Sequence, residues 1–171
     1  MKMTAQESLK AILEKAHQRA ASFFEKQNID GGLETCSKDR LEELYERFVM
    51  AGDLGGAAAA LIGQKLKFGL DDETQLTAKK LADMLGSQGA AEFYDWSNCE
   101  KALLYLELAA GLDPDNFEAS FEVISVCTQG HPFRPEEALP YAVNAARLDP
   151  ARDEVAYVTA CIEQNKTTQE R

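Results

Sequence analysis

Two segments of the chain are near copies of each other. Glu100 to Pro114 reads EKALLYLELAAGLDP, and Glu136 to Pro150, 36 positions further along, reads EEALPYAVNAARLDP. An internal period of that length is typical of stacked helical hairpins, in which each unit buries its apolar face only against its neighbours. The period therefore predicts an all-α fold made of antiparallel helix pairs.

The residues that the two copies share suit close helix crossings. Small side chains recur where two backbones would approach each other, and a tyrosine would fill the wider gap between hairpins. Each copy ends in Leu-Asp-Pro, and proline cannot continue a helix. We therefore expect each copy to be the second helix of a hairpin. The alanines are Ala102, Ala109, Ala110, Ala138, Ala145 and Ala146, and the tyrosines are Tyr105 and Tyr141.

Apolar residues at intervals of three and four predict eight helices and no strand. Thr4 with Glu7 forms a capping box for the first helix, and Ser97 with Glu100 is expected to form another. Asp115 with Glu118 is expected to cap the helix that runs to Gln129. We expect the fourth helix to bury Leu76 and Met84, and to end at Gly86 before a connecting segment. The expected helices are Thr4 to Gln27, from Asp39, from Leu54, from about Asp71 to Gly86, the first copy, Asp115 to Gln129, from Pro135 through the second copy, and Arg152 to Gln164.

The 171 residues are enough for one self-sufficient domain. Loops are short, and no low-complexity linker divides the chain. We expect an N-terminal helix and loop over residues 1–36, a divergent helical hairpin over 37–72, two repeats over 73–150, a capping helix over 151–165 and a flexible tail over 166–171.

Charge and cysteine content exclude several functions. Lys and Arg total 18 against 29 Asp and Glu, a formal charge of -11, which disfavours nucleic acid and anionic membranes as partners and favours basic ones. The N-terminus carries charges where a secretory signal needs an apolar run, so a cytoplasmic location is expected. Cys36, Cys99, Cys127 and Cys161 are far apart in the sequence, so we expect buried free thiols with no metal and no cofactor.

The repeated segments resemble two related families. The endings Leu112-Asp113-Pro114 and Leu148-Asp149-Pro150 look like those of tetratricopeptide repeats, and the spacing of Leu85-Gly86, Ala102, Tyr105 and Ala109-Ala110 is similar to Sel-like repeats. The resemblance covers roughly Thr74 to Gln164. It implies a right-handed superhelix of helix pairs that serves as a scaffold for protein binding, with the first helices of the pairs lining a groove.

Two lines of residues on expected first helices are candidates for partner binding. They follow intervals of three and four, which places each line on one side of its helix, facing either a groove or bulk solvent. The first line is Glu118, Glu122, Ser125 and Gln129, and the second is Lys80, Asp83 and Ser87.

An aromatic group is a further candidate. Phe93, Tyr94 and Trp96 crowd into the expected connecting segment, and Tyr and Trp dominate binding hot spots. Packing under a long loop is the alternative interpretation.

The sequence favours a non-catalytic module of a bacterial protein that binds a segment of another protein in a groove between helix pairs. A chaperone of the tetratricopeptide class that serves secretion, or an inhibitor that covers a basic toxin, are alternatives within protein binding. A small hydrolase using Glu92 and Asp95 as paired carboxylates is the enzymatic alternative. His17 and His131 lack a pattern that suggests a catalytic triad, so we expect both to be structural.

Overall fold

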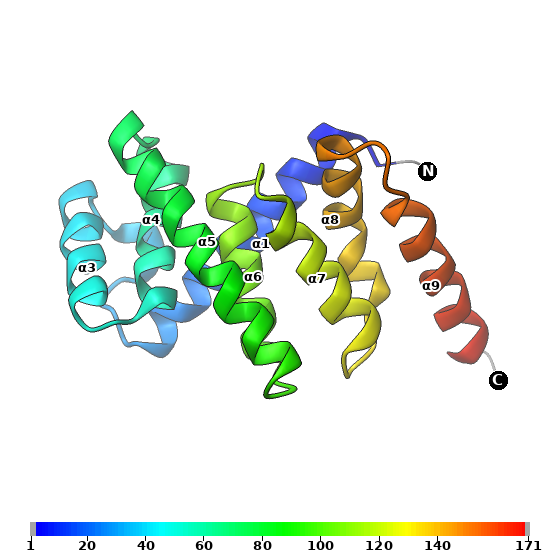
Figure 1. Cartoon of the computed structure of the whole chain (residues 1–171). Helices are drawn as coiled ribbons and strands as arrows, with labels where there is room; N and C mark the ends of the chain where they lie inside the picture. The colour runs from blue at the N-terminus through cyan, green and yellow to red at the C-terminus, as the bar shows by residue number, and fades with distance from the viewer. Residues whose placement is uncertain (1–2, 170–171) are drawn as a thin grey trace.

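The computed structural model describes residues 3–169, and all of the regular structure in that range is helical. The expected all-α class is therefore confirmed. Figure 1 shows consecutive helices packed side by side along the molecule. The helices are α1 (Ala5–Lys26), α2 (Gly32–Thr35), α3 (Lys38–Met50), α4 (Leu54–Phe68), α5 (Asp72–Tyr94), α6 (Cys99–Leu112), α7 (Phe117–Gln129), α8 (Pro135–Leu148) and α9 (Glu154–Gln169).

Side-chain caps fix where several helices begin. The Thr4 amide donates to Glu7 Oε2 at 2.7 Å and the Glu7 amide donates to Thr4 Oγ1 at 3.2 Å, so the expected capping box of α1 is confirmed. Asp53 and Asp71 accept the amides that open α4 and α5, at 2.9 and 2.8 Å. Each cap satisfies a backbone donor that has no partner inside its helix.

Two other expected caps are wrong, each by one residue. Asn98 caps α6 and Asn116 caps α7, each accepting a backbone amide three residues on, at 3.2 and 3.0 Å. Ser97 has a φ of 53°, which is incompatible with the extended backbone of a capping residue, so it cannot pair with Glu100. Asp115 instead donates its amide to the Asp113 carboxylate within the preceding turn.

The helix α5 does not end at Gly86 as the sequence predicted but continues to Tyr94. The reason is a close approach to α6 one turn later. A Cβ at Gly89 would lie 2.6 Å from Leu106 Cγ and 3.2 Å from the Ala102 carbonyl oxygen. Tight packing of the two helices therefore keeps the segment helical despite two glycines with poor helix propensity.

Two smaller differences concern the ends of the chain. The segment through Cys36, expected to be a loop, contains the single helical turn α2. The last helix continues past Gln164 to Gln169, through most of the tail that we expected to be flexible. Residues 170 and 171 of that tail lie outside the described part of the structure.

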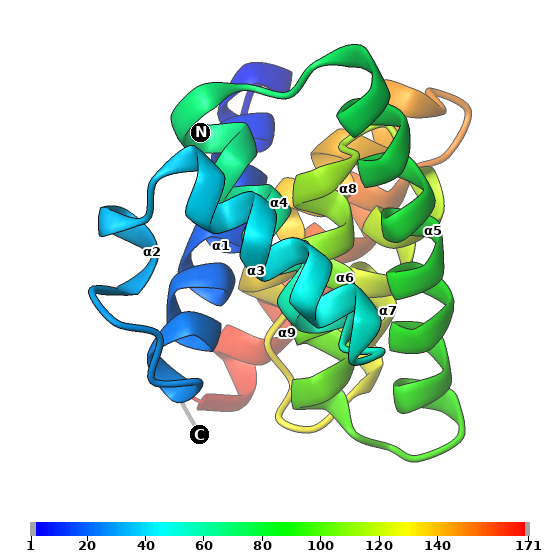
Figure 2. The same ribbon diagram turned by 90° about the vertical axis from the view of Figure 1, so that its left-hand side faces the viewer.

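Consecutive helices form three pairs, α3 with α4, α5 with α6 and α7 with α8, and α9 packs on α8. The two copied segments are α6 and α8, the second helices of their pairs. Viewed along the stack in Figure 2, α4, α6 and α8 lie in the middle, α5 and α7 on one side and α1 on the other. The first helix contacts all three second helices, so it spans the whole stack.

One row of side chains on α1 makes this contact. It is buried at every fourth residue, the spacing of a ridge along a helix. A Cβ at Gly111 of α6 would lie 2.2 Å from the Ala16 Cβ, so the two helices touch where both side chains are small. Ser8 Oγ donates to the Pro140 carbonyl oxygen in α8 at 2.6 Å. The row is Ser8, Ile12, Ala16, Ala20 and Phe24.

A buried carboxylate lies under the same helix. The side chain of Glu107 on α6 is fully buried and forms an ion pair with Arg19 on α1. Burial raises the pKa of Glu107, while the charge of Arg19 opposes that rise. Among the described residues, Glu107 Oε1 and the Tyr141 hydroxyl have no hydrogen-bond partner. The second copy has Val143 at the position of Glu107, so this contact belongs to α6 alone.

The copied small residues lie at buried positions with one exception. Ala146, expected at a helix crossing, is half-buried because it lies near the end of α8. Tyr141 is 2% exposed, whereas Tyr105 is half-buried beside Gly55 of α4. The fully buried members are Ala102, Ala109, Ala110, Ala138 and Ala145.

A Gly111→Ala substitution tests the crossing of α1 and α6. The added methyl group has no room against Ala16, so we expect the free energy of unfolding to fall by about 1 to 3 kcal/mol in urea denaturation. Gly86→Ala is the matched control, because nothing lies within 4 Å of a Cβ there. It should leave stability unchanged or raise it by up to about 1 kcal/mol. Equal effects at both positions would contradict the crossing.

Candidate functional site

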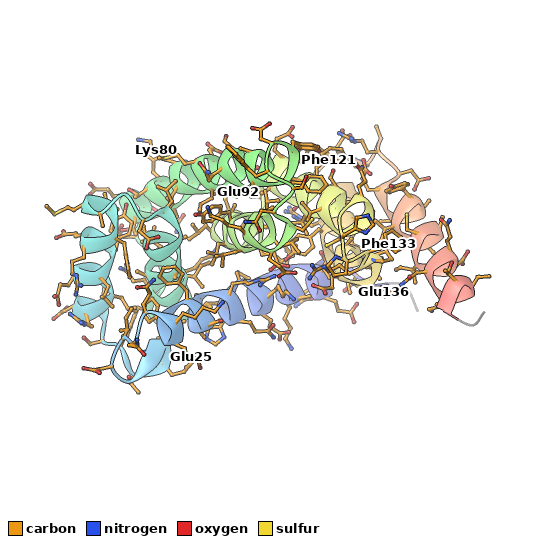
Figure 3. The ribbon with its side chains drawn as sticks, turned by 90° about the horizontal axis from the view of Figure 1, so that it is seen from below. Glu25, Lys80, Glu92, Phe121, Phe133 and Glu136 are labelled. Atoms are coloured by element: carbon orange, nitrogen blue, oxygen red, sulfur yellow. The ribbon has the colours of Figure 1, made fainter. Side chains whose placement is uncertain are left out.

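The candidate residues on α5 and α7 lie on adjoining helices, on the side of the stack away from α1. Asn116 Nδ2 donates to Asp83 Oδ1 at 2.8 Å, and the Tyr94 hydroxyl donates to Glu122 Oε2 at 3.0 Å. Figure 3 shows Lys80 of α5 and Phe121 of α7 on the same outer edge. We call this surface the α5–α7 face, and its residues are Leu76, Lys80, Asp83, Met84, Ser87, Tyr94, Glu118 and Glu122.

The line expected on α7 is only partly accessible. Glu118 and Gln129 are exposed, but Glu122 is half-buried and Ser125 is 4% exposed. Ser125 was therefore wrongly expected on an exposed line. The cause is the added length of α5, whose last residue, Tyr94, covers this part of α7 and bonds to Glu122.

The line expected on α5 is accessible throughout. Lys80, Asp83 and Ser87 are all exposed, and Ser87 Oγ donates to the Asp83 carbonyl oxygen at 3.1 Å. This hydrogen bond within the helix leaves the Asp83 carboxylate free to accept from Asn116. The α5 line and the accessible part of the α7 line therefore meet at the junction of the two helices.

The three aromatic residues have different environments. Phe93 is half-buried and packs against the core, with its ring centroid 4.9 Å from that of Tyr94. Tyr94 is 58% exposed and Trp96 is 74% exposed. Core packing therefore describes Phe93 alone, while Tyr94 and Trp96 offer aromatic surface at the end of α5.

Two apolar side chains on α5 were assigned to the wrong side of the helix. Leu76 and Met84 are 55% and 53% exposed, although we expected them in the core. They lie four residues before and four after Lys80, which is on the exposed side. Their spacing of four residues from Lys80 is the feature of the sequence that could have predicted their exposure. The α5–α7 face therefore combines apolar surface with carboxylates.

The edge of α7 is closed by the segment that precedes α9. The rings of Phe117 and Phe121 stack with centroids 6.0 Å apart, and the Arg152 guanidinium lies 4.9 and 4.6 Å from the two centroids. A cation held over two aromatic rings is stabilised by their negative faces. The arrangement fixes one border of the α5–α7 face.

Electrostatics set the protonation of the central carboxylate. Burial raises the pKa of Glu122, the hydrogen bond from Tyr94 opposes that rise, and the negative charge of Glu118 adds to it. Burial also raises the pKa of the Tyr94 phenol, so it stays protonated and donates to Glu122. Glu122 is thus an acceptor whose affinity for a proton depends on its two neighbours.

The residues considered for catalysis have other environments. Glu92 is 6% exposed and its Oε1 lies 2.6 Å from Lys101 Nζ, while Asp95 is exposed at the end of α5. His17 Nε2 lies 2.6 Å from Glu34 Oε1, and His131 is exposed. Within residues 3–169, none of these four side chains forms a hydrogen bond with a serine, threonine or cysteine side chain.

All four cysteines are free thiols. Cys36, Cys99 and Cys127 are buried, but Cys161 is half-buried, contrary to the expectation that all are buried. Burial raises the pKa of Cys127 to about 12, so its thiol stays protonated. Within residues 3–169, no three His, Cys, Asp or Glu side chains come together as a possible metal site.

None of the helices in the described residues combines the length and the hydropathy required to cross a bilayer.

Comparison with known proteins gave no relatives. No protein-family model, no curated protein and no solved structure matches the chain.

The geometry around Glu122 can be tested by NMR titration of its side-chain carboxyl. Tyr94→Phe removes a donor, so we expect the pKa of Glu122 to rise further above its ordinary value. Glu118→Gln removes a nearby negative charge, so we expect the pKa of Glu122 to fall. Glu43→Gln on α3, whose partner is Arg40, is the control and should leave it unchanged. Shifts of the same sign in the first two variants would refute this geometry.

Proposed function

We propose that this protein is a non-catalytic protein-binding module that holds a segment of a partner protein on the α5–α7 face. The main support is the composition of that face, where exposed Leu76, Met84 and Tyr94 lie among the carboxylates of Asp83 and Glu118. A face of this kind suits an amphipathic segment that presents apolar and basic side chains together.

The location of α1 supports the choice of face. That helix covers α4, α6 and α8, and so the second helices offer little free surface on their outer side. The first helices α5 and α7 have no such cover among the described residues. The surface of α5 and α7 is therefore more accessible to a partner than that of the second helices.

We also propose that the helix pairs form a right-handed superhelix of the tetratricopeptide or Sel-like type. Three consecutive pairs and the use of both copied segments as second helices support this assignment. The net charge of -11 favours a basic partner over nucleic acid or an anionic membrane. Four free thiols favour a cytoplasmic location.

The binding face is tested by crosslinking in the source cells. A photoreactive residue replaces Met84 on the α5–α7 face, or Met50 at the end of α3 as the control, since Met50 is 91% exposed. We expect a partner to be captured from position 84 and not from position 50. Equal capture from both positions, or none from position 84, would contradict the proposal.

A charge reversal on the α5–α7 face measures the electrostatic contribution to partner binding. Glu118→Lys should lower capture from position 84 by about two- to fivefold, the effect of one exposed charge pair. Glu43→Lys makes the same change of charge on α3 and should leave capture unaltered. A partner that still binds as a short peptide indicates chaperone-like recognition, whereas salt-sensitive binding of only the intact partner indicates an inhibitor.

A further inference from the structure

One buried carboxylate belongs to neither the α5–α7 face nor the pattern of the repeat. Glu107 lies on α6 beneath α1, and its side chain is 0% exposed. The second copy has Val143 at the same position, so an apolar residue can serve there. A buried charge costs stability unless it is fully paired. Packing alone therefore does not account for Glu107.

The Glu107 carboxylate is paired on one side only. Its Oε2 accepts a hydrogen bond from Arg19 Nε on α1, whereas its Oε1 has no partner among the described residues. Burial, and then the charge of Glu107, raise the pKa of Tyr141 on α8 and of Cys127 on α7, so both stay protonated. Of these three buried groups, Glu107 is the one that can change its charge between acid and neutral pH.

Other charged groups from every helix that packs against α6 lie around this pair, and they have acceptors or partners of their own. Arg19 is thus the cation that directly neutralises Glu107. The other pairs are Lys15 with Glu137, Arg134 with Glu100 and Lys101 with Glu92, and Lys65 of α4 donates to the carbonyl oxygens of Gly111 and Leu112.

Arg19 has access to solvent that Glu107 lacks. The side chain of Arg19 is 23% exposed and lines an open hollow of about 270 Å³ between α1 and α6, together with Lys26, Glu100 and Lys101. The hydrogen bond from Arg134 lowers the pKa of Glu100, and the charge of Arg19 adds to that effect. Arg19 can therefore leave Glu107 and keep both water and a second carboxylate nearby.

We propose that Glu107 is a proton-sensitive switch in the contact between α1 and α6. When Glu107 is charged, it holds Arg19 inward, and one carboxylate oxygen stays buried without a partner among the described residues. When Glu107 takes up a proton, the buried charge is removed and Arg19 turns to the hollow. The close packing of Ala16 on Gly111 needs neither group and persists. The contact of α1 is therefore more stable in acid than at neutral pH.

The sign follows from linkage between proton binding and folding. Burial raises the pKa of Glu107 above the ordinary value of 4.5, and the charge of Arg19 only opposes that rise. The folded chain thus binds this proton more tightly than the unfolded chain does. Its contribution to stability is complete below pH 4.5 and is lost as the pH rises through the folded-state pKa.

NMR titration of the Glu107 side-chain carboxyl and of the Arg19 Nε–H group tests the switch in the full chain. We expect the carboxyl to titrate above pH 4.5 and the Arg19 signal to shift with the same midpoint. Arg19→Gln removes the opposing charge and should move the Glu107 midpoint to higher pH. Arg40→Gln on α3, whose partner is Glu43, is the control and should leave it unchanged. A midpoint at or below 4.5, or an Arg19 signal that does not follow it, would overturn the proposal.

Urea denaturation measures the effect on stability. Glu107→Gln is neutral at every pH, so the unfolding constant of the unaltered protein, divided by that of the variant, should rise about twofold or more between about pH 4 and pH 7. Glu100→Gln is the matched control on the same helix, because Glu100 also pairs with an arginine but is 64% exposed. The pKa of Glu100 is lowered by Arg134, so the corresponding ratio should fall.

The two ratios should therefore change in opposite directions with pH. Ratios that change in the same direction, or a ratio for Glu107→Gln that does not depend on pH, would contradict the switch. If Glu107→Gln does not fold, the direction in which Arg19→Gln moves the Glu107 midpoint decides the question.

Discussion

The stack depends on the close contact of α1 with the second helices. At the centre of that contact, Ala16 faces Gly111 with no space for a further methyl group. Only small residues let two helix backbones approach so closely, and the approach brings Arg19 to the buried carboxylate of Glu107. In a simple repeat stack each hairpin contacts only its neighbours. Here one helix joins all three pairs.

This arrangement also determines which surfaces are left for partners. With the second helices covered, the first helices remain, and they differ along the stack. Helices α5 and α7 are joined by two hydrogen bonds, one between Asp83 and Asn116 and the other between Tyr94 and Glu122. Among the described residues no close backbone contact joins α3 to α5, and a hollow lined by Glu46, Gln64 and Glu73 lies between them. One end of the stack thus offers a mixed apolar and acidic face, and the other a polar hollow.

Local signals predicted much of the fold, and tertiary contacts account for the rest. The cap at Thr4 and the role of both copies as second helices could be read from the sequence, because each depends on residues close together in the chain. Gly86 was misleading because packing at Gly89 overrides helix propensity. The burial of Ser125 follows from the length of α5.

Native-state hydrogen exchange tests the central claim about α1 most directly. If α1 joins the three pairs into one unit, the buried amides of α4, α6 and α8 should open with the same free energy, equal to that of global unfolding. If α1 did not join the pairs, the terminal pairs would unfold locally at a lower free energy than the central pair. Exchange of the α8 or the α4 amides at a free energy clearly below that of α6 would contradict the account.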